Sequence, residues 1–234
     1  MDIGIIGSGI VAQTLGGRLA GLGHGVMISS RDPGVAKDLG QRGVLPSADA
    51  WAAEQRSQGR TAAAGGFADA AAYGEIVINA TAGTVSLAAV GAAREADLEG
   101  KVLVDVSNPL DFSGGMPPTL AVCNTDSIGE RLQAAHPGAR VVKTLNTVNC
   151  AVMVDPQQLG EETDQFVAGN DLEAKTWVSE HLLRDWLGWT RVRDLGDISA
   201  ARALEMYLPL WLRLLTTTGS PSLNVRVVVA GEAA

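Results

Sequence analysis

The feature that most constrains the fold is an alternation of short apolar runs with segments of helical pattern. The runs are rich in Val and Ile and lack the strict alternation of a half-exposed strand, as is typical of buried parallel strands. They cover residues 2–7, 25–30, 75–81, 101–108, 140–146 and 164–170, with a fainter run at 60–65. Strands alternating with helices indicate βαβ units. We therefore predict an α/β fold, a doubly wound parallel sheet with a smaller C-terminal α/β extension.

A glycine motif follows the first apolar run. Gly7, Gly9 and Ala12 form the pattern G-x-G-x-x-A at the start of an apolar helical segment. Gly7 permits a tight turn, Gly9 lets the backbone approach a pyrophosphate, and Ala12 allows close packing of helix on strand. The free amides of the helix N-terminus can then bind phosphate without a lysine. The motif predicts a Rossmann-type dinucleotide site.

The end of the second strand indicates which dinucleotide binds. About 20 residues after the motif, an NAD site carries an acid that binds the ribose hydroxyls. Here Ser29 and Ser30 are followed by Arg31. A guanidinium and hydroxyls favour a 2′-phosphate, which a carboxylate would repel, so we predict NADP(H). The alternative is that Arg31 is a solvated loop charge and that Asp32 binds the ribose.

Composition argues against several classes of partner and site. Eighteen Lys and Arg against 26 Asp and Glu give a net charge of -8, which disfavours binding to nucleic acid or to an anionic membrane. No apolar run approaches the roughly 18 residues that span a bilayer, and the N-terminus does not read as a signal peptide. Cys123 and Cys150 are expected to be free, buried thiols. No spacing of His, Cys, Asp or Glu fits a metal site. A cytoplasmic protein is expected.

Two later stretches bear on a second substrate and on assembly. Residues 109–123 contain three prolines and two glycines, which favours a functional loop after a strand. Residues 198–219 have a helical pattern that Pro209 should kink. Apolar residues of that segment, among them Met206 and Trp211, indicate a buried core or dimer contact, or alternatively a pocket wall.

We expect two regions and a homodimer. Residues 1–148 would form the NADP-binding Rossmann domain. Residues 149–234 would pack on it as an extension that completes the substrate site and contributes the dimer contact.

Six motifs, spread over nearly the whole chain, resemble one known family. The motifs are IGIIGSGIVAQTL, ISSRDP, INATAG, DVSNPL, VVKTLNTVN and EMYLPLWLRL…LNVRVV, in that order. The chain resembles the coenzyme F420-dependent NADP oxidoreductases, and in particular the actinobacterial proteins known as NADPH-dependent F420 reductases.

The resemblance implies roles for individual positions. The pyrophosphate loop would be Ser8, Gly9, Ile10 and Val11, and the 2′-phosphate pair would be Ser30 and Arg31. The nicotinamide half would lie along Ala80, Thr81 and Ala82. The deazaflavin would be flanked by Asn108, Pro109 and Leu110, and the reacting rings by Asn146, Thr147 and Val148, with Met206 as a further substrate contact. Asn108 and Thr147 would also bind the NADP(H). Two departures concern the second substrate: Lys37 comes two positions later than a lysine of some members, and Asn146 replaces a histidine of the archaeal enzymes.

For hydride transfer between two rings, the main tasks of the protein are to position the rings and to exclude water. The expected wall is neutral, with Asn146 and Thr147 as ring-positioning candidates. No general acid is evident: His24, His136 and His181 are expected near turns or helix ends. Cys150 is expected to be inert, and Asp105 to be an internal polar group.

Three functions remain open at this stage. The first is hydride transfer between NADP(H) and coenzyme F420. The second is NADPH-dependent reduction of another flat acceptor, such as a flavin, quinone, ferric chelate or imine. The third is a non-catalytic NADP(H) redox sensor. The loop at 109–123 and the residues at 146–149 favour a true second-substrate site.

Overall fold

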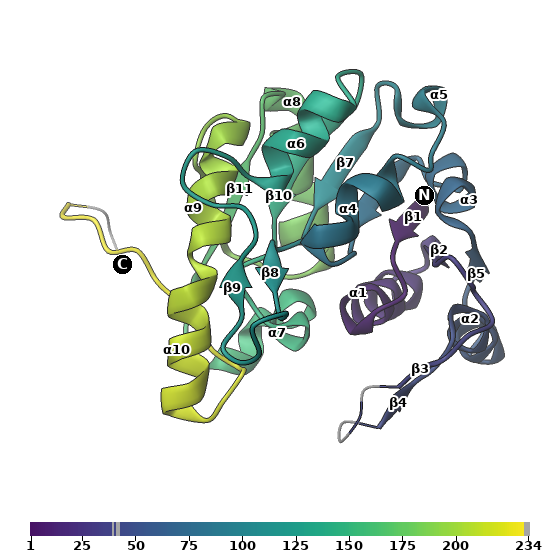
Figure 1. Ribbon diagram of the computed structural model, residues 1–234, viewed down its shortest axis with the longest axis horizontal. Helices are drawn as coiled ribbons and strands as arrows, with labels where there is room; N and C mark the ends of the chain where they lie inside the picture. The colour runs from purple at the N-terminus through teal and green to yellow at the C-terminus, as the bar shows by residue number, and fades with distance from the viewer. Residues whose placement is uncertain (39, 41–42, 232–234) are drawn as a thin grey trace.

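The centre of the molecule is one eight-stranded sheet. The computed structural model describes residues 1–38, 40 and 43–231. Within them the strand order is β12-β11-β10-β7-β6-β1-β2-β5 (Figure 1). The strands are β1 (Asp2–Ile6), β2 (Gly25–Ser29), β5 (Ala62–Gly65), β6 (Ile76–Asn79), β7 (Val102–Asp105), β10 (Arg140–Thr144), β11 (Asp164–Ala168) and β12 (Arg191–Asp194). β1 lies between β2 and β6, so the strand order reverses there, and ligands of such sheets bind beside the strand ends at this point.

The predicted strands are confirmed, including the faint one at 60–65, and each is slightly shorter than its apolar run. Two features of the sheet differ from the expectation. β11 runs antiparallel to β10, and β12, which was not predicted, pairs parallel with β11 at the edge. The connection after β10 contains only short helical segments, α7 (Cys150–Val154) and a 3₁₀ turn (Pro156–Leu159). At roughly 1.5 Å per residue α7 is too short to cross back over the sheet, so the next strand runs the opposite way.

Helices cover both faces of the sheet. The longer ones are α1 (Ile10–Gly21), α2 (Ala48–Ser57), α3 (Phe67–Tyr73), α4 (Gly83–Val90), α6 (Ile128–Ala135), α8 (Leu172–Trp177), which continues as a π-helix over Val178–Trp186, and α10 (Leu208–Thr218). Shorter ones are α5 (Glu95–Leu98), a 3₁₀ turn (Ile198–Ala200) and α9 (Ala201–Met206). Successive strand residues point to opposite faces: Ile5 joins the core cluster beneath α1 and α2, and Ile6 joins the cluster that includes residues of α4 and α6. The sheet is therefore doubly wound, as predicted.

Two small hairpins lie outside the main sheet. The first pairs β3 (Lys37–Asp38) with β4 (Val44–Leu45), after the turn that carries Arg31. The second pairs β8 (Leu110–Asp111) with β9 (Thr119–Leu120), so the proline-rich stretch at 109–123 is an irregular excursion closed by a two-stranded ribbon. In Figure 1 this ribbon lies beside α10.

The C-terminal region continues the main sheet and then leaves it. β11 and β12 extend the sheet that β1 to β10 begin. The expected kink is present: α9 ends at Met206, and α10 begins at Leu208 with Pro209 in its first turn. Leu210, on α10, is 53% exposed. α10 lies at one end of the molecule (Figure 1), and the tail after it returns to the start of β11, where the Val225 carbonyl accepts a 3.0 Å hydrogen bond from the Asp164 amide.

Both cysteines are free, as predicted, but they are not buried. Cys123 is exposed and Cys150 is half-buried. Cys123 follows β9 in the loop that leads to α6, where the chain lies at the surface. Within the described residues, no helix has both the length and the apolar character needed to cross a membrane.

Candidate functional site

The turn between β1 and α1 is held by backbone alone. Gly7 has a φ of +130°, a backbone angle that residues other than glycine rarely adopt. A Cβ on Gly7 would lie 2.7 Å from the carbonyl oxygen of Ala80. Gly7 also exchanges two backbone hydrogen bonds of 3.1 Å with Ser29. The ends of β1, β2 and β6 therefore meet at this glycine.

Gly9 serves a different purpose. It is the N-cap residue of α1, and a Cβ built on it would meet no atom within 4 Å. No side chain caps the helix, and its first turn contains no acidic residue. The first amides of a helix lack intrahelical partners and attract anions. The open space over Gly9 and the uncapped amides fit a pyrophosphate.

A cavity of about 780 Å³ opens beside this turn. Of the predicted cofactor residues it is lined by Gly7, Ser8, Gly9, Ser29, Ser30, Arg31, Ala80, Thr81 and Ala82. Four predicted cofactor residues are not part of its lining: Ile10, Val11, Asn108 and Thr147. Ile10 lies next to the cavity with 54% of its surface exposed. The cavity is lined by three segments that are far apart in sequence and that follow three neighbouring strands, β1, β2 and β6. A dinucleotide site of this fold requires this arrangement.

The cavity also has a wall that sequence reasoning missed. This wall is apolar and consists of Val35, Phe67, Val85, Ala88, Ala89 and Ala92. Most of these residues come from α4 and its C-terminal end, and Val85 is 52% exposed. The sequence carried one signal for it, the apolar segment with Val85 that follows the INATAG turn, but nothing in the pattern shows which face of α4 meets the cavity.

Two cations line the cavity without a carboxylate partner. Within the described residues, Arg31 and Lys37 form no ion pair and no side-chain hydrogen bond. Burial, and then the neighbouring Arg31 guanidinium, lower the pKa of Lys37. β3 brings Lys37 to Arg31 although it comes late in the family's pattern. Asp32 lines the same cavity, so its position also fits the alternative in which it binds a ribose.

Ser29 contributes to the shape of the turn. Its side chain is fully buried, and its hydroxyl donates a 2.9 Å hydrogen bond to the carbonyl oxygen of Ile5. Ser30 is half-buried and lines the cavity next to Arg31. Of the two serines, Ser30 therefore has the side chain that is free to bind a ligand.

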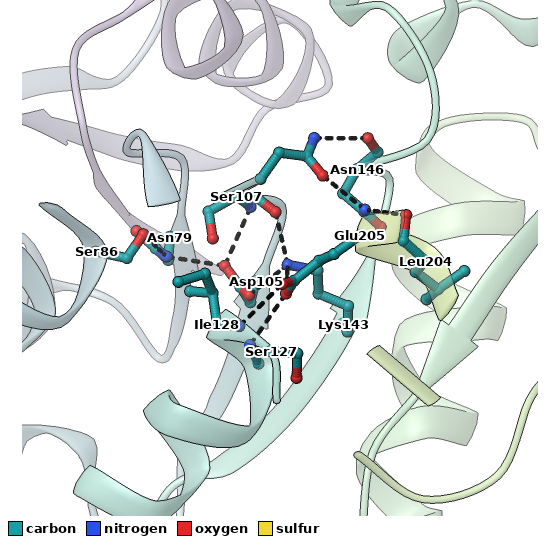
Figure 2. Close-up of polar contacts among 12 residues, drawn as sticks. Asn79, Ser86, Asp105, Ser107, Ser127, Ile128, Lys143, Asn146, Leu204 and Glu205 are labelled. Atoms are coloured by element: carbon teal, nitrogen blue, oxygen red, sulfur yellow. Dashed lines mark hydrogen bonds and ion pairs between the residues drawn. The ribbon is translucent and has the colours of Figure 1, made fainter. Parts of the chain in front are cut away.

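A second group of predicted residues lies at the ends of β7 and β10. The Asn146 side-chain amide donates to Asn108 Oδ1 at 2.9 Å, and Asn108 Nδ2 donates to the Asn146 carbonyl at 2.8 Å. Asn146 Nδ2 also donates to the carbonyl of Leu204 in α9, at 3.0 Å. We refer to Asn108 and Asn146 as the asparagine pair (Figure 2). The pair binds two strand ends to each other and to the C-terminal helices.

The asparagine pair adjoins the nucleotide cavity through α4. The amide of Gly83 donates to the Asn108 carbonyl at 3.0 Å, and a Cβ on Gly83 would lie 2.4 Å from that oxygen. Gly83 directly follows Ala82, a cavity residue. Leu145, which precedes Asn146, has a φ of +60° although it is not glycine, and such backbone strain is concentrated at functional sites.

The other predicted substrate residues surround the pair with little exposed surface. Thr147 and Val148 are 2% and 6% exposed, and Thr147 Oγ1 has no hydrogen-bond partner. Pro109 is buried, and Leu110 begins the ribbon β8–β9. Met206 lies at the end of α9, where its sulfur accepts a hydrogen bond from the Asn124 amide. Both Asn146 and Ser107 retain a buried oxygen without a partner, Oδ1 and Oγ respectively.

Beneath the asparagine pair is a buried ionic cluster of Asp105, Lys143 and Glu205 (Figure 2). Asp105 is an internal polar group, as predicted, but Lys143 and Glu205 were missed. Burial by itself would lower the pKa of Lys143, but the two carboxylates outweigh it and hold that pKa above the usual value. Burial raises the pKa of Glu205, and the attraction of Lys143 offsets this only in part.

The histidines lie away from these groups. His24 packs against Trp186 with ring centroids 4.1 Å apart, and His136 follows the last residue of α6. His181 Nδ1 lies 3.2 Å from an Asp185 carboxylate oxygen on an exposed helix. The Cys150 thiol donates a long hydrogen bond to the neighbouring Asn149 side-chain oxygen and packs against the main core cluster. Within residues 1–38, 40 and 43–231, no group of three His, Cys, Asp or Glu could hold a metal ion.

Comparison with known proteins agrees with this geometry. The family described as NADP oxidoreductase, coenzyme F420-dependent, matches residues 2–109. A proposed F420-dependent NADP reductase from Arthrobacter sp. FB24 is 46% identical; its crystal structure has a TM-score of 0.88 and the match covers 98% of this chain and 100% of that one.

Two further proteins are more distant. Metalloreductase STEAP3 of Rattus norvegicus is 29% identical over 222 residues, which is 94% of this chain but only 38% of the rat protein. The hypothetical protein SMa0349 from Sinorhizobium meliloti is 25% identical with a TM-score of 0.64, over 86% of this chain and 87% of that one.

Proposed function

Since this chain belongs to the coenzyme F420-dependent NADP oxidoreductase family, and is therefore an NADP-dependent oxidoreductase, we propose that it transfers a hydride between NADP(H) and a deazaflavin, coenzyme F420. The single observation that carries the choice of dinucleotide is the cavity in which Arg31 and Lys37 have no ion-pair partner among the described residues, beside an uncapped helix N-terminus. The choice of deazaflavin is supported by the family and by the neutral residues around the asparagine pair.

The chain's own residues would position the dinucleotide in three ways. The amides that follow Gly9 bind the pyrophosphate in the space where a Cβ is absent. Arg31, Lys37 and Ser30 bind the 2′-phosphate through charge-assisted hydrogen bonds. The apolar face of α4 packs against the base. Local geometry thus binds a polyanion to a molecule whose net charge is -8.

Near the reacting centre the chain would act by positioning and by exclusion of water. When bound, the nicotinamide and the deazaflavin supply the hydride chemistry themselves. The turns at 107–109 and 146–148 present neutral side chains, and Asn108 and Asn146 are already locked to each other. A wall of this kind holds flat rings in a fixed geometry without a competing proton donor.

A second candidate acceptor is a ferric chelate. The specific observation in its favour is the similarity to a metalloreductase, which covers 94% of this chain. The rat protein is much longer than this chain, so its metal-reducing part need not have a counterpart here.

The decisive experiment is a turnover assay with matched acceptors. The purified protein is titrated with NADPH by fluorescence and then mixed with oxidised F420, with flavin mononucleotide or with a ferric chelate. Rapid loss of the deazaflavin's visible absorbance, with little turnover of the others, is the expected outcome. Selective flavin or ferric turnover would assign a different acceptor, and tight NADPH binding without any turnover would indicate a sensor.

The C-terminal residues 149–234 would complete this site. Asn146 is bound to Leu204 of α9; Met206 ends that helix and Leu208 begins α10. A homodimer through α10 would cover Leu210, which this helix leaves exposed.

A further inference from the structure

Three polar residues form a row across the sheet just below the asparagine pair. In register, Asn79 of β6 pairs with Asp105 of β7, and Asp105 pairs with Lys143 of β10. All three side chains are fully buried. Charges in such a position are expensive to desolvate and are retained only with complete partners. Packing alone therefore does not explain why these three buried polar residues are present.

Lys143 uses all three of its hydrogens. Its ammonium group lies 2.8 Å from Asp105 Oδ2, 2.8 Å from Glu205 Oε1 and 2.6 Å from the Ser107 carbonyl oxygen. The other oxygen of Asp105 accepts from the Ser107 amide at 3.1 Å. The peptide groups on both sides of Ser107, the residue before Asn108, are thus fixed by the same ion pair.

The row continues in both directions. Asn79 donates to Asp105 Oδ1 at 2.8 Å, and its own oxygen accepts from the Thr81 hydroxyl at 2.7 Å. Thr81 lines the nucleotide cavity. At the other end, Glu205 accepts from the Ile128 amide at 2.9 Å, at the start of α6. One connected network therefore runs from the cavity to the C-terminal helices.

We infer that Lys143 is a positioning residue for hydride transfer, because it holds the turn of Ser107 and Asn108 at a set distance from the Thr81 turn of the nucleotide cavity. This inference rests on the proposed function, in which the asparagine pair adjoins the second ring. Lys143 touches neither ring; it acts through the Ser107 peptide groups and through Glu205, which precedes Met206.

The test compares two lysines. Lys175, on α8, is also nearly buried, with its ammonium 2.8 Å from Asp194 and 2.9 Å from the Gly196 carbonyl; Asp194 belongs to β12, two strands away from β10, which carries Lys143. Lys143→Met and Lys175→Met each remove one such group, and both should lower the melting temperature. The NADPH dissociation constant and the single-turnover rate of NADPH oxidation by F420 are measured for each. If Lys143→Met does not fold, Glu205→Gln is used instead. This variant leaves the ion pair of Lys143 and Asp105, one positive and one negative charge, so no buried charge loses its last partner.

The expected result is a selective loss of rate. Lys143→Met, or Glu205→Gln to a smaller extent, should slow hydride transfer by roughly tenfold to a hundredfold with NADPH affinity unchanged, since a misplacement of about 1 Å can cost this much. Lys175→Met should keep the rate. An unchanged rate in Lys143→Met, or an equal loss in both variants, overturns the inference.

Failure of the proposed function has a separate signature. If the unaltered protein does not reduce F420, the acceptor is wrong, and the positioning role is then read from amide hydrogen exchange with NADPH bound. Faster exchange at Ser107 and Asn108 and at 145–147 in Lys143→Met alone supports it; the same exchange in both variants overturns it.

Discussion

At the scale of single residues, recognition of the dinucleotide depends on charges that are left unpaired. Several cations of this acidic molecule pair with carboxylates, as Arg94 does with Asp97. Arg31 and Lys37 have no such partner in the described structure and lie together in the cavity. Two like charges brought side by side raise the free energy of the unliganded protein, and an anion with two negative charges relieves that repulsion.

Arg31→Ala should therefore reduce the preference for NADPH over NADH by roughly tenfold to a hundredfold, because a charge-assisted hydrogen bond is lost. The measurement is the ratio of kcat/KM for the two coenzymes. Arg94→Ala, which removes an exposed arginine elsewhere, is the matched control and should leave the ratio unchanged. If Arg31→Ala also leaves it unchanged while Asp32→Asn weakens NADH, the ribose is bound by Asp32 and the NADP assignment through Arg31 is wrong.

Two histidines give the stability a dependence on pH. Burial lowers the pKa of both His24 and His136 below 6.5. As the pH falls below 6.5, the unfolded chain takes up these protons before the folded chain does. The stability that comes from keeping these two histidines neutral in the folded protein is therefore fully present above pH 6.5. It is lost as the pH falls through their lowered pKa values. The variant His24→Phe/His136→Phe should show a smaller fall of the melting temperature between neutral and mildly acidic pH. A parallel fall in both proteins would contradict this assignment.

At the scale of elements, the two glycines of the β1–α1 turn have separable roles. Gly7 is required by the backbone, since its φ is positive and a Cβ would clash with Ala80. Gly9 has a φ of -72° and open space around its missing Cβ, so the fold does not need glycine there. We therefore expect the pyrophosphate to occupy the space over Gly9.

Gly9→Ala should accordingly lower NADPH affinity about tenfold or more without lowering the melting temperature of the free protein, because the methyl group occupies the approach of the pyrophosphate. Gly7→Ala is the contrasting variant and should lower the melting temperature itself. Calorimetry of the free proteins and fluorescence titration with NADPH separate the two effects. Full NADPH affinity in Gly9→Ala would place the pyrophosphate elsewhere.

The sequence anticipated elements best where the local pattern is strong. The buried strands β1, β6 and β7 are continuous apolar runs, and such runs can form little else between helices. β12 reads Arg-Val-Arg-Asp, a partly exposed edge strand without an apolar run, so nothing local distinguishes it from a loop. The direction of β11 was also missed, because a strand's own residues do not encode which way its neighbour runs.

At the scale of the whole molecule, α10 and its surroundings indicate assembly. Leu210 is 53% exposed on α10, and Phe112 and Met116, in the loop between β8 and β9, are 57% and 72% exposed. Exposed apolar side chains of this size are candidates for an interaction surface. A second copy of the chain is the proposed partner.

Leu210→Arg should convert a dimer to a monomer, since a buried unpaired charge at an interface is strongly unfavourable. Leu172→Arg, on α8, is the matched control: Leu172 is an equally helical leucine, 68% exposed, at a distant face. Sedimentation velocity of the three proteins gives the answer. A monomeric unaltered protein, or dissociation of both variants, would rule out α10 as the dimer contact.

The chain's local patterns by themselves determined the doubly wound sheet, the glycine turn and the cation after β2, because hydrophobic period and turn geometry act over a few neighbouring residues. Only the tertiary structure showed that Lys37 joins Arg31, that α4 supplies the apolar wall, and that Asn108 is locked to Asn146. The same holds for Asp105, Lys143 and Glu205, which come from two adjacent strands and a late helix. Such contacts depend on strand register and on how helices pack, and these are set by the burial of the whole core rather than by any one segment.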